Sequence, residues 1–217
     1  MRPILAAVAL ASLALPVAAP AQAGVSIAGF ETDGSVGLAR AEYQAIGRAL
    51  GALLGARLGS ASGATVVPLT PLPEGRPGRV DLAAARNAAT VAGARLLVVG
   101  SLLDQYGDIQ VEARIIDAST GKPVAVVRGD PSLVRRDQLA EAIAALADRL
   151  ATQPRIGATP GGGNATGIPV AALVEFGKGI ALEESGDRAG AATAYRAAVA
   201  ASPGFTEARV ALQRVGG

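Results

Sequence analysis

The side chains that most enzymes use for acid–base or nucleophilic chemistry are scarce in this chain. Its 217 residues include no His and no Cys, which removes the imidazole base, the thiolate nucleophile and Cys/His ligation of zinc. The remaining candidates are carboxylates, Ser, Tyr and the lysines. Glu112 and Asp117 lie on one predicted strand, but their odd spacing makes them point to opposite faces. Catalysis by this carboxylate pair is therefore not predicted.

Two other groups of residues resemble ligand-binding sites, but their sequence context does not favour ligand binding. The segment "GGGNATG" at 161–167 follows no strand and precedes no Gly-Lys-Ser/Thr, so it reads as linker rather than as a phosphate-binding loop. Three aspartates, Asp104, Asp108 and Asp117, are spread over a turn and two strand ends without the spacing of a calcium loop. We expect no catalytic residue, no metal and no cofactor, and hence no enzyme.

The charge pattern argues against nucleic acid as a partner. The chain has 20 Lys and Arg and 18 Asp and Glu, which gives a net charge of +2, and aromatic residues make up 3% of it. Nucleic-acid binding normally needs a basic stripe or aromatic side chains on which bases stack. The densest basic cluster is the Arg135–Arg136 pair, so no nucleic-acid interface is expected.

The first 23 residues have the three parts of an export signal. Arg2 provides the positive start, an apolar stretch runs over 4–15, and Ala21-Gln22-Ala23 forms a small-x-small cleavage site. The alternative is a membrane anchor, which needs about 20 uninterrupted apolar residues, whereas Pro16 and Pro20 interrupt this run. We expect cleavage near Ala23, a periplasmic protein, no lipid anchor because Cys is absent, and no integral membrane segment after cleavage.

Residues 24–152 alternate predicted strands and helices, which indicates an α/β domain with a mixed sheet and flanking helices. The clearest strand is 108–117, where Ile109, Val111, Ala113 and Ile115 alternate with polar residues. A hairpin turn is predicted at 118–122, and 130–136 reads as a loop. The other expected elements are strands at 25–30, 64–69, 94–103 and 123–129, and helices at 41–58, 81–92 and 137–151.

Residues 153–168 are rich in Gly, Pro and Thr and lack a periodic apolar face, so we predict a flexible linker. Beyond it, 169–217 has the pattern of an all-α unit. Helices are expected at 170–185, 189–201 and 206–215, with a turn at Gly186-Asp187 and Pro203 after the second helix.

The segment "GDRAGAATAYRAAVAASPGF" at 186–205 resembles a tetratricopeptide repeat. The family's signature positions fall on Gly179, Ala191, Tyr195, Ala198 and Pro203. Glu175 and Lys178 depart from the pattern, since large apolar side chains usually stand there. One repeat is fewer than a free-standing array needs, so it should pack on a partner, a second copy or the α/β domain, with the helix from Thr206 as its cap.

The resemblance to this repeat family implies a peptide-binding concave face on the first helix. The side chains expected there, as a partner-binding site, are Leu173, Phe176, Ile180, Glu183 and Glu184. The apolar members of this set are equally compatible with the core of the cap or of the domain junction.

The α/β region resembles the TolB amino-terminal-like domain shared by CsgG-type and FlgO-type envelope proteins. The resemblance is carried by "VSIAGFETDG" at 25–34 and by "AGARLLVVGSLLDQYGDIQVEARIIDASTGKPV" at 92–124, with Gly93, Gly100, Asp117 and Gly121 at the family's positions. CsgG-type pore proteins carry a lipid-anchor Cys and long inserted hairpins, whereas this chain has no Cys and room for insertion only at 71–80. Pore formation is therefore not expected.

Together these features predict an exported, non-enzymatic periplasmic adaptor or scaffold that binds an envelope protein or peptide. The alternative is a structural component that assembles with copies of itself, as a homo-oligomer, in an envelope secretion or motility complex. A third hypothesis, an enzyme that uses carboxylates or Ser, would require a closed polar pocket in which Asp or Glu side chains converge.

Overall fold

The computed structural model describes residues 24–32, 34–69, 76–162 and 167–216. The predicted export signal at 1–23 lies outside the described residues. The α/β part consists of β1 (Gly24–Thr32), α1 (Arg40–Gly59), β2 (Thr65–Val66), α2 (Leu82–Val91), β3 (Leu96–Gln105), β4 (Asp108–Asp117), β5 (Pro123–Arg135), the short 3₁₀ helix η1 (Arg136–Gln138) and α3 (Leu139–Ala151). Three further helices follow: α4 (Val170–Glu184), α5 (Arg188–Ala201) and α6 (Thr206–Gly216).

The strands form one mixed sheet, as the alternation of elements predicts. The order is β2-β1-β3-β4-β5, with β1 parallel to β2 and to β3, and with antiparallel pairing from β3 through β5. The predicted turn at 118–122 is confirmed, since Asp117 N–H donates to the Lys122 carbonyl and Gly121 has a φ of 73°. The α/β class with a mixed sheet, followed by C-terminal helices, is therefore confirmed.

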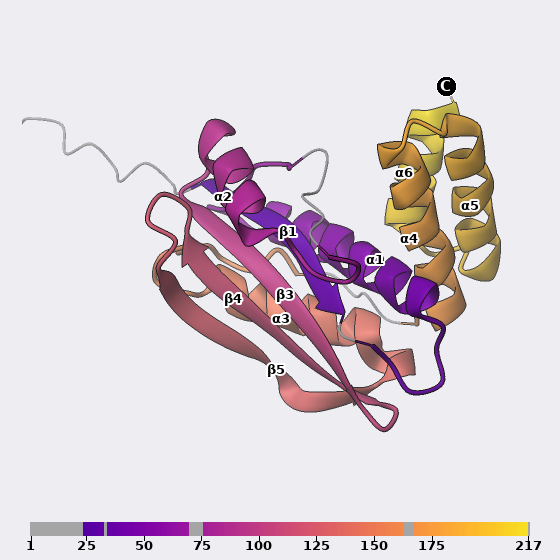
Figure 1. Ribbon diagram of the computed structural model, residues 1–217, viewed down its shortest axis with the longest axis horizontal. Helices are drawn as coiled ribbons and strands as arrows, with labels where there is room; N and C mark the ends of the chain where they lie inside the picture. Colours follow the sequence, from indigo (N-terminus) through magenta and orange to yellow (C-terminus); the bar gives the residue numbers. More distant parts are fainter. Residues whose placement is uncertain (1–23, 33, 70–75, 163–166, 217) are drawn as a thin grey trace, which may run out of the picture.

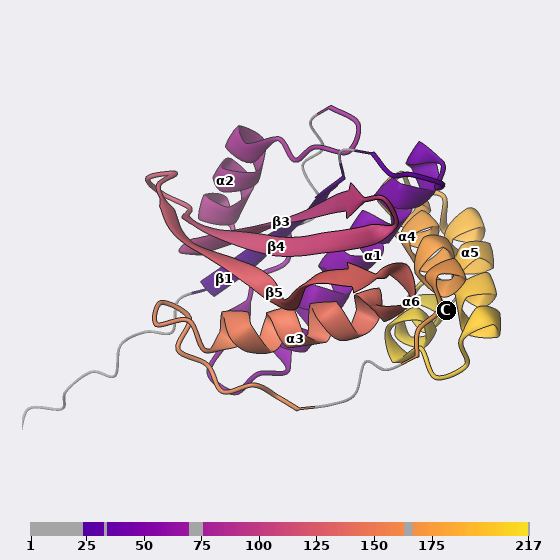
Figure 2. The same cartoon turned by 90° about the horizontal axis from the view of Figure 1, so that it is seen from below.

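Helices cover the two faces of the sheet unequally (Figure 1). Helices α1 and α3 pack on one face and α2 on part of the other, which Figure 2 shows from below. The period of two in β4 explains the larger core, because Ile109, Val111, Ala113 and Ile115 all face α1 and α3 and are buried. Strand β3 is buried on both faces near its start, where Leu97 and Val99 contact the smaller core under α2.

The prediction of a loop at 130–136 was wrong, because β5 continues to Arg135. The chain bulges after Arg128 and rejoins β4, where Val134 pairs with Ile109 and is buried. Within this stretch Pro131 lacks an N–H, which in a central strand would interrupt the ladder. On β5, at the edge of the sheet, the missing donor need not cost a hydrogen bond of the ladder. The strand predicted at 64–69 is shorter in the structure. Thr65 and Val66 pair with β1, and the Val67 N–H donates one further hydrogen bond to the Val25 carbonyl.

Among the C-terminal helices, α4 packs on α1, α5 packs on α4 and α6 on α5, and all three contribute to the core that α1 belongs to (Figure 1). Within the predicted linker, the structure describes 153–162 and 167–168, and there Ile156, Ala158 and Ile168 are buried in the same core. Ser62 and Thr159 also exchange two backbone hydrogen bonds, of 2.9 and 2.8 Å. Both described parts of the segment between α3 and α4 are therefore packed against the α/β layer.

Candidate functional site

The α4–α5 hairpin is built on small residues and one large ring. Gly186 makes the turn with a φ of 86°, and the Asp187 side chain accepts from the Gly190 N–H at 2.8 Å to begin α5. A side chain at Gly179 would overlap the ring of Tyr195, so the absence of a Cβ is what lets the two helices approach. The sequence inference that a glycine here accommodates Tyr195 is confirmed.

The hairpin is joined to the α/β layer through a second close approach, between Gly177 on α4 and Ala45 on α1. A Cβ at Gly177 would overlap the carbonyl group of Ala45. Phe176 beside it is buried, with ring centroids 5.7 Å from Tyr195 and 4.8 Å from Phe205. The approach of Gly177 to Ala45 places α4 against α1, and the ring contacts of Phe176 join α4 to α5 and to the turn before α6.

A groove of about 560 Å³ lies among α1, α4 and α6. Helix α1 contributes small side chains, and α4 contributes an apolar floor and carboxylates. Helix α6 contributes the side chains of one of its faces, from Thr206 to Arg214. The lining residues are Ala52, Ala56, Phe176, Ile180, Glu183, Glu184, Thr206, Glu207, Val210, Ala211 and Arg214.

Four of the five predicted partner-binding residues line this groove: Phe176, Ile180, Glu183 and Glu184. The fifth, Leu173, does not, because it is fully buried in the main core. Sequence reasoning missed the contributions of α1 and α6. Val210 of α6, which is 56% exposed, is the largest apolar side chain that this helix adds to the groove.

Glu183 is the best-anchored carboxylate of the groove. Its Oε2 accepts from the Tyr195 hydroxyl at 2.7 Å and from the Arg214 guanidinium at 2.7 Å. Burial, and then the Glu183 carboxylate, raise the pKa of Tyr195. Burial alone would lower the pKa of Arg214, but its hydrogen bond and ion pair with Glu183 outweigh this and raise it. Tyr195 therefore stays a neutral donor and Arg214 a cation at any physiological pH.

Tyr195→Phe is expected to lower the free energy of unfolding by about 1–3 kcal/mol, the usual cost of removing a hydrogen bond to a charged group. Chemical denaturation measures this loss. The matched control is Tyr106→Phe, because Tyr106 is 96% exposed at the β3–β4 turn and should leave the midpoint unchanged. Equal midpoints for the two variants would show that the Tyr195–Glu183 bond does not contribute.

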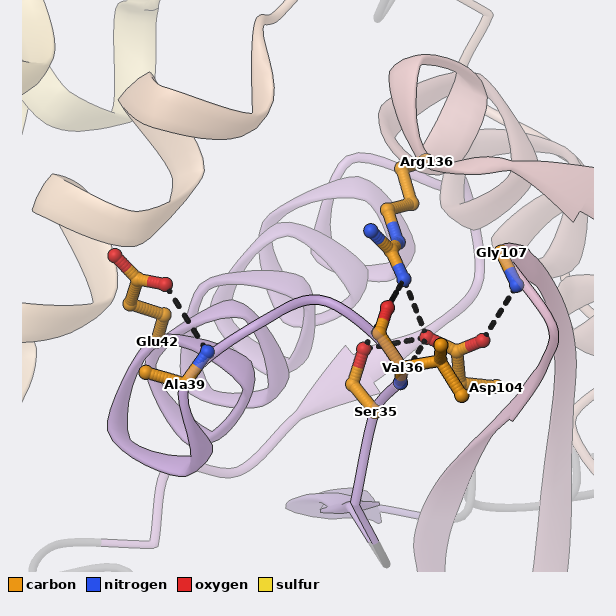
Figure 3. Close-up of polar contacts among 7 residues, drawn as sticks. All are labelled: Ser35, Val36, Ala39, Glu42, Asp104, Gly107 and Arg136. Carbon is orange, nitrogen blue, oxygen red and sulfur yellow. Dashed lines mark hydrogen bonds and ion pairs between the residues drawn. The ribbon is translucent and has the colours of Figure 1, made fainter.

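A second polar cluster fixes the loop that leads into α1 (Figure 3). The Asp104 side chain is fully buried and accepts from the N–H groups of Gly107 at 2.8 Å and Val36 at 3.2 Å. The Ser35 hydroxyl donates a hydrogen bond to Oδ2 of the same carboxylate. The Arg136 guanidinium forms an ion pair with this Oδ2 at 2.7 Å. This cluster joins the end of β3 to the loop before α1 and to η1, so its role is to position α1.

The Asp104 cluster predicts a pH dependence. Burial alone would raise the pKa of Asp104, but the hydrogen bonds from Ser35 and Gly107 and the pairing with Arg136 outweigh it and lower the pKa. The stabilisation is therefore complete above the unfolded-state pKa and is lost as the pH falls through the lower folded-state pKa.

Asp104→Asn should accordingly cost about 2 kcal/mol at pH 7, and the difference from wild type should shrink steadily below about pH 4. Unfolding curves at several pH values measure this. Asp130→Asn is the control, since the side chain of Asp130 is 77% exposed although it pairs with Arg149. A difference for Asp104→Asn that stays constant down to pH 2 would contradict the assignment.

The polar groups near the β4–β5 turn are bonded to one another. Ser119 and Lys122 have the Ser-x-x-Lys spacing, but the Ser119 hydroxyl donates to Asp117 Oδ1 at 2.7 Å. That bond, with those from Thr120, lowers the pKa of Asp117 to about 2. A cavity of about 470 Å³ beside the turn is lined by Lys122 and Arg155 among others. Among the described residues, no group of three or more His, Cys, Asp or Glu is placed to hold a metal ion.

No protein-family model matches the chain, and no curated protein matches it. Several solved structures are similar to part of it, and three of them are described here. TolB from Acinetobacter baumannii is 12% identical with a TM-score of 0.39, over 60% of this chain and 27% of TolB. The LpoB C-terminal domain from Salmonella enterica is 13% identical with a TM-score of 0.35, over 55% and 87% of the two chains. A PelC dodecamer from Paraburkholderia phytofirmans is 14% identical with a TM-score of 0.34, over 60% and 85%.

The chain thus spans about a quarter of the length of the TolB chain that it matches. TolB, whose amino-terminal domain the sequence of the α/β region resembles, is one of these three structures. The resemblances to a tetratricopeptide repeat and to CsgG-type proteins stay predictions.

Proposed function

We propose that the protein is an exported, non-enzymatic adaptor that binds a segment of a cell-envelope protein in the groove among α1, α4 and α6. One observation carries the proposal: four residues assigned to partner binding from the sequence line a single groove with an apolar floor. Ile180 is only partly buried and Val210 is 56% exposed. Covering such side chains is the main source of binding free energy when proteins associate.

The chemistry of the groove supports recognition rather than catalysis. Glu183 is engaged by Tyr195 and Arg214. The raised pKa of Tyr195 keeps its hydroxyl protonated at physiological pH, so no phenolate is present to act as a general base. The chain has no His or Cys to supply another general base or nucleophile. What the groove offers a partner is apolar area and carboxylate oxygens.

The export pattern at 1–23 supports a location in the cell envelope, with the remainder of the chain released after cleavage. In the part of the chain that the structure describes, every helix is too short or too polar to cross a membrane.

A photo-cross-linking amino acid at Val210 tests the proposal in the living cell. It should yield one main cross-linked protein, while the same amino acid at Val91, which is 88% exposed on α2, should yield none. Ile180→Arg, which places a charge on the apolar floor, should reduce the Val210 cross-link at least tenfold. The captured protein, once purified, should bind the wild type and not the Ile180→Arg variant.

Two other outcomes have definite meanings. A cross-link that joins two copies of this chain through Val210 would support the self-assembling alternative instead. Cross-links of equal yield from Val210 and Val91, unaffected by Ile180→Arg, would refute the groove as the binding site.

A further inference from the structure

The charged side chains around the groove are mainly acidic. Three carboxylates, Glu183, Glu184 and Glu207, line it with one guanidinium, that of Arg214, which leaves the lining with a net charge of −2. Glu207 has no hydrogen bond or ion pair within the part of the chain that the structure describes. An apolar floor with an acidic rim is complementary to a segment that is both apolar and basic.

The Glu183 side chain is already oriented to bind a cation of the partner, with no change of rotamer. Both of its internal bonds end on Oε2, where Tyr195 and Arg214 donate. Its Oε1 has no hydrogen-bond partner among the described residues, and the side chain is 28% exposed. Two donors on one oxygen fix the orientation of the carboxylate, so a partner's Lys or Arg meets an acceptor whose side-chain entropy is already lost.

The dimensions of the groove suit a short helix. The lining faces run from Phe176 to Glu184 on α4 and from Thr206 to Arg214 on α6. Eight helical steps of 1.5 Å make each face about 12 Å long, or about two turns. On the third side, Ala52 and Ala56 of α1 are small enough for another helix to approach closely.

We propose that the occupant of the groove is a basic amphipathic helix, an inference that rests on the function proposed above. Its apolar side chains cover Ile180 and Val210, and its Lys or Arg side chains bind Oε1 of Glu183 and the carboxylate of Glu207. This is the helix-in-groove mode of recognition, with the anchors spaced three or four residues apart.

The test uses a random library of displayed peptides of about 15 residues, a length at which isolated helices begin to form in water. Peptides are selected on the full mature chain, and those that also bind the Ile180→Arg variant are discarded. The remaining groove-dependent peptides should carry an excess of Lys and Arg over Asp and Glu, with apolar residues at helical spacing.

Charge variants complete the experiment with purified peptides from that selection. The double variant Glu183→Gln/Glu207→Gln should weaken their binding about tenfold and remove most of its salt dependence. Glu175→Gln is the matched control, because Glu175 lies on α4 outside the groove and pairs with Lys178; it should leave the affinity unchanged. Repeating the selection on Glu183→Lys/Glu207→Lys should enrich acidic peptides.

The outcomes separate the two proposals. Groove-dependent peptides that are neutral or acidic would overturn the charge inference and leave the binding function intact. A selection in which no peptide distinguishes wild type from Ile180→Arg would count against the groove itself. Unfolding curves for each variant confirm that the comparison is made between folded proteins.

Discussion

Gly177→Ala is expected to separate the C-terminal helices from the α/β layer. A methyl group at this position would overlap the backbone carbonyl of Ala45 on α1, and a helix backbone cannot move aside as a side chain can. Overpacking of this kind costs about 3 kcal/mol, well above the gain of up to about 1 kcal/mol from replacing a helical Gly by Ala. Chemical denaturation should show this loss, and binding through the groove should be lost with it.

Gly55→Ala is the matched control for this prediction. Gly55 lies in α1, and a Cβ there would be 3.5 Å from Ile27 Cδ1, an ordinary van der Waals contact. The substitution should therefore leave stability unchanged or raise it by about 0.5–1 kcal/mol. If Gly177→Ala were as stable as Gly55→Ala and kept its binding, the contact between α1 and α4 would not be what builds the groove.

Phe176→Ala is expected to have the second large effect. The ring is 4% exposed and lies between Tyr195 and Phe205, which belong to α5 and to the turn before α6. Removing it leaves a cavity at the point where α4, α5 and α6 meet, and such truncations cost about 3–5 kcal/mol. Thermal or chemical unfolding measures the loss, and the groove would lose the aromatic part of its floor.

Phe176→Leu separates volume from aromatic contact at this position. Because Leu fills most of the space, its cost should stay within about 1.5 kcal/mol, and peptide binding should persist. A loss below 1 kcal/mol for Phe176→Ala would mean that the three C-terminal helices do not depend on this ring, contrary to its burial.

The patterns that identified the α/β layer are local ones, and they were sufficient for it. The alternation from Ile109 to Ile115 and the glycine turn at Gly121 are read from neighbouring residues, and both are present in the structure. The continuation of β5 to Arg135 was missed because Pro131 is a local signal for a break. Whether a proline ends a strand depends on whether that strand lies at the edge of the sheet, which neighbouring residues do not determine.

The groove was predictable only on the helix that carries a recognisable pattern. The resemblance to a tetratricopeptide repeat placed Phe176, Ile180, Glu183 and Glu184 on one face. It also placed Leu173 there, which the structure buries in the core. The walls from α1 and α6 depend on the contact between Gly177 and Ala45, two residues 132 positions apart. Nothing in the local pattern of Ala52 or Arg214 indicates that they belong to the same site.

The most direct test of partner binding in the groove is methyl NMR of the mature protein, labelled at Ile, Leu and Val, titrated with the protein captured from the Val210 cross-link. The groove hypothesis predicts that the methyl signals of Ile180 and Val210 shift, while those of Val91 on α2 and Val126 on β5 do not. Shifts at Leu103, Val126 and Leu133, which are 48%, 53% and 42% exposed on the sheet, with Ile180 and Val210 unchanged, would contradict it. That result would place the partner on the sheet instead.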